Sequence, residues 1–384
     1  MAAHLGLNQS TISRIEAGAR PRDKATALAV ATAYRLTRVE THEWLELLFG
    51  GADAPLGDDA GNGEWLARAY AVLERAGVEP DLAAYHYFEP IAPAAGRWLG
   101  LGFDAELTAV IDQVLANSHL LPRSHLLLEL AATFSHYLNE HGHYRRRLAL
   151  ALAAADAARE VECRTVEGWL RSDAIPWTLL TQRPNPAEAS RQLARGLALA
   201  EELHHADMQA IGLAFLAWAL AMQWKMTAAN ETIAHALAVV CAPAARLRVL
   251  WVAGDLAASD ESNEGQERAI GYYRLAEETD LAVGHGHHTT VTATLRLSAA
   301  YARRREPDAA RAVLSTLLAD RQAPLSPPRL ARIYFDLARL SRMEGDGAMA
   351  QTYARQAAAA LQQGEKDLRF GQQIRAFLAE LSRA

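Results

Sequence analysis

Apolar and small residues recur with a period of roughly forty positions along most of this chain, from about residue 124 to 363. In each period a stretch with a large apolar residue beside Ala or Ser is followed by small and aliphatic residues spaced three or four apart. This spacing predicts two helices, each with one apolar face. The copies comprise Leu216, Ala217, Leu220, Ala229, Ile233 and Ala236; Val252, Ala253, Leu256, Ala269, Tyr273 and Ala276; Leu297, Ser298, Tyr301, Ala310, Leu314 and Leu317; and Leu337, Ala338, Ser341, Ala350, Ala354 and Ala357.

The repeated unit predicts a stack of helical pairs. Large residues fill the space between the two helices of a pair, and Ala or Ser lets them approach closely. One pair cannot bury both of its faces, so neighbouring pairs are expected to stack into an α-solenoid. The offsets resemble those of the tetratricopeptide repeat, with longer inter-helix loops. Degenerate copies near Leu130 and Trp169 bring the expected number to about six units.

Other parts of the chain also have helical patterns, at residues 24–36, 37–49, 64–76, 104–118 and 367–381. The last of these is expected to cap the stack. Pro80, Pro90 and Pro93 predict an irregular segment between residues 76 and 104. Because Val, Ile and Thr never gather into alternating runs, we predict an all-α fold.

The N-terminal residues 5–18 have the pattern of two short helices joined by a tight turn. Gly6 is suited to the turn, Asn8 to the N-cap of the second helix, and Gly18 to its C-terminal end. Ile12 and Ile15 lie three positions apart and are expected to face inward. The polar residues of the same helix then face outward, as in a helix-turn-helix whose second helix enters the major groove of DNA.

The run LGLNQSTISRIEAGARP resembles the helix-turn-helix of the Cro/C1 (XRE) class of bacterial transcription regulators. The resemblance covers about fifty residues and implies an operator-binding domain. It implies that base edges are contacted by Gln9, Ser10, Ser13 and Arg14, and that Thr11 and Arg20 lie near phosphate. Two-fold symmetric operators imply a homodimer.

This resemblance has one departure. The family domain has five helices, and the chain as written begins within the second of them. We therefore expect that the true start lies upstream or that the chain was truncated. Because Leu5, Ile12 and Ile15 would lose part of their cover, we expect the chain as written to bind DNA weakly.

Charge and composition suggest a division into domains. Residues 1–38 hold six basic and two acidic side chains, a net charge of +4, which leaves −10 for the rest of a chain whose total is −6. A basic end on an acidic body suits phosphate contact at the N-terminus. Residues 50–63 are rich in Gly, Pro and Asp and predict a linker. The expected domains are therefore residues 1–49, binding double-stranded DNA, and 64–384, forming the helical repeats.

Several classes of protein are disfavoured by the sequence. The two cysteines, Cys163 and Cys241, suit a reducing cytoplasm better than a disulfide framework, and the most apolar run, residues 210–222, is too short for a membrane span. None of the three lysines follows a Gly-rich loop, and the HExxH and GxSxG motifs are absent. We expect no enzyme activity, cofactor, metal or membrane partner. The histidines at 285, 287 and 288 lack nearby carboxylates or thiolates and predict an inter-helix loop.

Aromatic and arginine side chains within the repeats are candidates for a ligand-binding groove. Either they line a concave surface that binds a peptide or protein, or most of the aromatic residues are inter-helix core. The aromatic candidates are Trp169, Trp177, Trp218, Trp224, Trp251, Tyr272 and Tyr301; the candidates for binding a carboxylate are Arg171, Arg191 and Arg303 to Arg305.

These expectations combine into one functional hypothesis and an alternative. The hypothesis is a cytoplasmic transcription regulator whose repeat domain senses a ligand or partner, a peptide-pheromone receptor being a special case. The alternative is a protein–protein interaction scaffold with a hairpin that does not bind DNA. Salt dependence separates the two, because operator binding weakens steeply as salt rises and depends on sequence.

Overall fold

The computed structural model describes residues 60–76, 103–118, 125–182, 184–283, 288–319, 325–361 and 369–383. Every regular element in these ranges is a helix, which confirms the predicted all-α class. None of the described helices combines the length and apolar character needed to cross a membrane. The predicted helix-turn-helix, residues 1–49, and the proline-rich segment lie outside the described residues.

The first described helices form a small unit beside the main stack. Helix α4 (Ala60–Ala76) packs on α6 (Asp104–Ala116), and the two also contact α7 (His125–Glu140) and α8 (Tyr144–Glu160). The predicted linker was expected to extend to residue 63, but α4 already begins at Ala60. Trp65 and Leu66 are buried in the core, and their packing stabilises the start of this helix. The small and polar residues at positions 60–64 can form one more helical turn before them.

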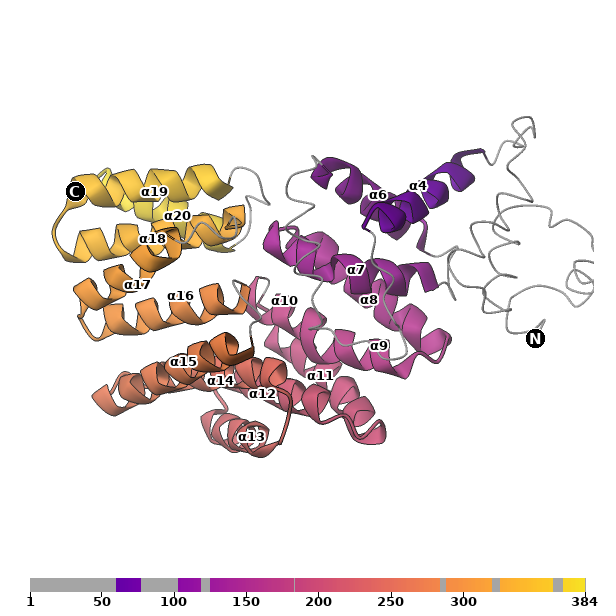
Figure 1. The fold of residues 1–384 in the computed structure, drawn as a ribbon, viewed down its shortest axis with the longest axis horizontal. Coiled ribbons are helices and arrows are strands. Elements are labelled where there is room, and N and C mark those ends of the chain that lie inside the picture. Colours follow the sequence, from indigo (N-terminus) through magenta and orange to yellow (C-terminus); the bar gives the residue numbers. More distant parts are fainter. Residues whose placement is uncertain are drawn as a thin grey trace, which may run out of the picture.

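The remaining helices follow one another round an arc (Figure 1), and each packs chiefly on its neighbours in sequence. The arc runs from α7 and α8 through the middle helices to the C-terminal ones, where α18 returns to contact α7. The elements are α9 (Arg164–Trp169), η3 (Leu170–Ala174), α10 (Ile175–Thr181), α11 (Pro186–Glu202), α12 (Ala206–Met222), α13 (Met226–Ala238), α14 (Pro243–Ala257), α15 (Asn263–Val283), α16 (His288–Arg303), α17 (Pro307–Ala319), α18 (Pro327–Met343), α19 (Gly347–Leu361) and α20 (Arg369–Leu381).

Most of the residues that carry the forty-residue pattern lie between these helices. The buried alanines of the pattern are Ala229 and Ala236 of α13, Ala269 and Ala276 of α15, and Ala350, Ala354 and Ala357 of α19. Larger members of the pattern, such as Tyr273 and Leu314, are buried as well. Large and small residues therefore interlock between neighbouring helices, as the pattern predicts.

A second repeated feature is the turn that ends many of the helices. Within the described ranges, six residues in these turns have a positive φ. In each case the N–H of the following residue bonds to the carbonyl five positions before it. In the first turn, for example, the N–H of His143 lies 2.8 Å from the carbonyl oxygen of Leu138. This is the hydrogen bond of a Schellman motif, which satisfies a carbonyl at the helix end. The six residues are Gly142, Glu162, His204, Trp224, Arg305 and Gly345.

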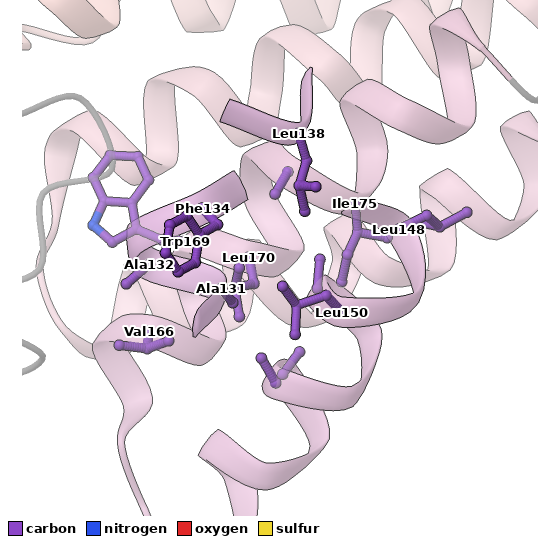
Figure 2. Packing of buried hydrophobic residues seen from close by; sticks show 14 of the residues in the cluster. Ala131, Ala132, Phe134, Leu138, Leu148, Leu150, Val166, Trp169, Leu170 and Ile175 are labelled. Carbon is purple, nitrogen blue, oxygen red and sulfur yellow. The ribbon is translucent and has the colours of Figure 1, made fainter. Parts of the chain in front are cut away.

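The segment from α9 to α10 contains one wide π-helical turn. Pro176 has no N–H, and its ring would clash with the carbonyl of residue 172 in a regular α-helix. The chain instead forms η3, in which the N–H of Ile175 bonds to the carbonyl of Leu170, five positions earlier. Figure 2 shows how side chains of this segment, including Trp169, pack with Phe134 of α7 and Leu150 of α8 in the main core.

Candidate functional site

A cleft of about 580 Å³ lies inside the arc of helices. Helices α10, α12, α14, α15, α16, α18, α19 and α20 contribute to it, together with the turn between α7 and α8. Its volume lies in the range typical of sites for small molecules. The lining residues are Gly142, Tyr144, Trp177, Leu180, Thr181, Gln182, Trp218, Asp255, Tyr273, Leu295, Arg296, Ala299, Arg303, Pro327, Pro328, Arg329, Arg332, Ala360, Leu361, Phe370, Gly371 and Gln373.

One wall of the cleft is aromatic. Trp177 of α10 and Trp218 of α12 meet edge to face, with ring centroids 6.1 Å apart, and Phe215 packs beside both. The indole N–H of Trp177 donates a hydrogen bond to the side-chain oxygen of Asn139, 3.1 Å away. This bond orients the Trp177 ring, which is half-buried and lines the cleft.

An arginine lies next to this aromatic wall. Arg296 of α16 donates from Nε to both oxygens of Asp255, at 2.9 and 3.0 Å. Its guanidinium carbon lies 6.0 Å from the ring centroid of Trp177 and 5.6 Å from that of Trp251, within the range of cation–π attraction. The hydroxyl of Tyr273 donates to Asp255 at 2.7 Å. Burial and the Asp255 charge raise the pKa of Tyr273 well above its ordinary value, so Tyr273 remains a donor at neutral pH.

Three further arginines line the cleft, and they differ in their partners. Arg303 is exposed and has no hydrogen bond or ion pair to another described residue. Arg332 bonds to Asp336 at 2.9 Å, and the charge of Asp336 raises the pKa of Arg332 further above its ordinary value. Arg329 of α18 is paired with Glu140. Arg303 therefore contributes a positive charge that no described carboxylate neutralises.

The pair of Arg329 and Glu140 joins the two ends of the arc. Arg329 Nε lies 2.7 Å from one carboxylate oxygen of Glu140, and one of its terminal nitrogens lies 2.9 Å from the other. Ser326 Oγ is 3.3 Å from the same carboxylate. The Glu140 side chain is only 4% exposed and that of Arg329 15%. This two-point contact, hereafter the clasp, connects α7 to α18, and its Arg329 also lines the cleft.

The turn between α7 and α8 also contacts α6. His143 Nε2 lies 2.7 Å from Asp104 of α6, and the Tyr137 hydroxyl lies 3.0 Å from the same carboxylate oxygen. Burial opposes the charge of Asp104, but the bonds and charge supplied by His143 and Tyr137 outweigh it and lower the pKa of Asp104. One short turn thus contacts the cleft, the C-terminal helices and the N-terminal unit.

Another buried carboxylate lies in the π-helical turn. Asp173 is fully buried, and its Oδ2 lies 3.6 Å from Arg248 Nε. Arg248 itself lies over Trp177 and Trp251, at 5.2 and 5.0 Å from their ring centroids. Burial raises the pKa of Asp173, while the charges of Arg248 and Arg147 oppose that rise.

The structure separates the residues that the sequence suggested for a groove. It places Trp177, Trp218 and Arg303 together in the cleft. Among the other aromatic candidates, Trp169 and Trp251 are core residues, Tyr272 is half-buried against the core, Tyr301 accepts a hydrogen bond from Arg274, and Trp224 is 90% exposed on a turn. Arg171 is buried and pairs with the buried Glu167 and the exposed Asp156, and Arg191 pairs with Glu188.

Sequence reasoning missed several lining residues, namely Asp255, Arg296, Arg329 and Arg332. An available signal was that all four are charged residues on helices of the repeat. Polar residues at such positions often mark a site, but many are simply solvated.

The expected DNA-contacting residues, Gln9, Ser10, Thr11, Ser13, Arg14 and Arg20, all lie outside the described residues. The histidines at 285 and 287 do too, and His288 begins α16. Within the described ranges, no group of three or more His, Cys, Asp or Glu side chains is arranged to hold a metal ion.

Comparisons with known proteins identify no family for this chain. No protein-family model matches the chain, and no curated protein is significantly similar to it.

Proposed function

We propose that this protein is a DNA-binding transcription regulator that acts by binding and not by catalysis. Residues 9–14 would read an operator, and the helical body would bind an effector in the cleft. The observation that carries the proposal is a pairing within one chain: a Cro/C1-like run at residues 5–21 precedes a helical body with a ligand-sized cleft. The cleft has an aromatic wall and the charge of Arg303, which no described carboxylate neutralises; both features favour ligand binding.

We further propose that the body is a tetratricopeptide-like solenoid. Support comes from the forty-residue pattern, the packing of neighbouring helices and the six turns with one hydrogen-bond pattern. In such an array, a ligand that contacts several helical pairs at once changes their relative arrangement. An effector that binds one arrangement better than another shifts the population toward it.

A homodimer is the expected working state, because two identical reading heads match a two-fold symmetric operator. The effector would then change the spacing of the two heads. This mechanism requires a differential affinity for the two arrangements, since a ligand that binds both equally shifts nothing.

The test is DNA binding by the full chain, with DNA flanking its own gene as the probe and a salt series to separate specific from non-specific binding. We expect Gln9→Ala and Arg14→Ala each to weaken specific binding by about 1–3 kcal/mol, because each removes a base contact. Arg164→Gln, on the surface of the helical body and paired with Glu202, is the matched control and should bind as the wild type does.

Two results would count against the proposal. Unchanged operator affinity in both N-terminal variants would mean that the recognition helix is elsewhere. Equal affinity for every DNA sequence would favour an interaction scaffold in place of a regulator.

A further inference from the structure

The chemistry of the cleft points to a class of ligand, and this inference deepens the proposed function by naming the effector of the same site. We propose that the cleft binds a small aromatic acid, a compact molecule with a flat ring and one carboxylate or comparable oxyanion. The ring would lie against Trp177 and Trp218, and the anionic group would contact Arg296 and Arg303.

The aromatic wall of the cleft is the evidence for an aromatic ring in the ligand. Trp177 and Trp218 come from different helices and are held edge to face, and Leu180 and Leu295 are further apolar residues that line the cleft. The bond to Asn139 holds the Trp177 ring before any ligand arrives. A rigid, half-buried indole surface favours a flat apolar group, because little side-chain entropy is lost when the two surfaces meet.

The charged residues of the cleft support an acidic group in the ligand. Asp255 lines the cleft but is engaged by Arg296 and Tyr273, and Arg329 and Arg332 have carboxylate partners of their own. Arg303 remains without a partner among the described residues. Arg296 uses only Nε for Asp255, so its terminal NH₂ groups bond to no described residue. Unused guanidinium donors beside an apolar wall match one oxyanion.

The clasp supports a compact ligand over an extended chain. Glu140 and Arg329 connect α7 to α18, and Arg329 itself lines the cleft. A peptide in an extended conformation needs a groove that is open along its length. The volume of about 580 Å³ and the contact between the two ends of the arc favour a molecule that fits within the arc.

The experiment is calorimetric titration of the full chain with two matched probes, 2-naphthoate and its neutral amide, 2-naphthamide. Both have the same ring system, so their difference isolates the charge. We expect the acid to bind at least about tenfold more tightly, because a hydrogen bond to a charged group is worth more than one between neutral groups. Arg303→Gln should remove most of that preference, and its exposed, unpartnered position should let the variant fold normally.

Two further variants sharpen the result. Trp218→Leu should weaken both probes by a similar factor, since it removes ring contact and not charge recognition. Arg164→Gln on the outer surface should bind both probes as the wild type does. Melting temperatures of all variants, measured without probe, show whether each one is folded.

Three outcomes would overturn the inference: equal affinity for acid and amide, an unchanged preference in Arg303→Gln, or no binding of either probe. An Asp- and Glu-rich hexapeptide that binds through Arg303 while naphthoate does not would assign the cleft to peptides. No DNA is present, so loss of the proposed operator binding would leave this result standing. Conversely, failure of both probes would leave the DNA-binding proposal intact.

Discussion

At the scale of single residues, Asp173 shows how burial and charge compete. Its carboxyl group is fully buried in the π-helical turn, with Arg248 Nε 3.6 Å from its Oδ2. Burial favours the neutral acid, and the two guanidinium groups of Arg248 and Arg147 only partly offset this. The folded chain therefore binds this proton more tightly than the unfolded chain does.

This imbalance predicts a pH dependence. Below the ordinary pKa of 3.8 the Asp173 carboxyl is neutral in both states. As the pH rises, the unfolded chain releases the proton first, so the free energy of unfolding of the wild type should fall relative to that of Asp173→Asn, which cannot titrate. Urea unfolding of both proteins at about pH 4.5 and about pH 7.5 measures the trend. The prediction is contradicted if the free energy of unfolding of the wild type, relative to that of Asp173→Asn, stays constant or rises between these two pH values.

At the scale of elements, the approach of α14 to α15 depends on one glycine. A Cβ atom at Gly254 would lie 2.3 Å from the ring of Tyr273, which is buried and bonded to Asp255. The ring cannot move away without breaking this bond beside the cleft. Gly254 therefore sets the distance between these two helices.

Gly254→Ala is expected to lower the free energy of unfolding by about 1–3 kcal/mol, as overpacking of a well-filled core does. Gly271→Ala is the matched control, because Gly271 lies in α15 with nothing within 4 Å of its added Cβ. There the same change should raise the free energy of unfolding by about 0.5–1 kcal/mol, since alanine favours helix. Similar effects of both substitutions in denaturant unfolding would refute this account of the packing.

At the scale of the whole molecule, the clasp joins the two ends of the arc. Glu140 and Arg329 are 189 positions apart in the sequence, yet they form a two-point contact that is largely shielded from water. Loss of one partner leaves a poorly solvated charge on the other. The neighbouring contact of His143 with Asp104 places the N-terminal unit beside the same turn.

Glu140→Gln and Arg329→Gln are each expected to lower the free energy of unfolding by on the order of 3 kcal/mol. The double variant should lower the free energy of unfolding by less than the sum of the two single effects. The charge that each single change leaves unpaired is absent when both residues are replaced. Small-angle X-ray scattering should show a larger radius of gyration for each single variant than for the wild type. Glu380→Gln, which breaks an exposed pair with Arg342, should cost less than about 1 kcal/mol and leave the radius unchanged. An unchanged radius in both clasp variants would show that the arc closes without this pair.

The sequence by itself determined the helical class and the places of most helices in the body. Helical periodicity and the alternation of large and small residues are local properties. The spacing of buried alanines could therefore locate α13, α15 and α19, and that of Ala310 and Leu314 could locate α17. The capping helix was predicted at residues 367–381, and α20 spans Arg369–Leu381. The cytoplasmic, operator-binding and dimeric expectations stay predictions.

Only the tertiary structure decided which side chains form the cleft. Trp177 and Trp224 are the same residue type in neighbouring repeats, yet one lines the cleft and the other is exposed on a turn with φ of 62°. Four of the six Schellman turns lack glycine, so their local sequence gives no sign of the left-handed residue. The pairing of Glu140 with Arg329 depends on the summed rotations of every helix between them. A pattern within one repeat does not contain that sum, so it became visible only in the folded chain.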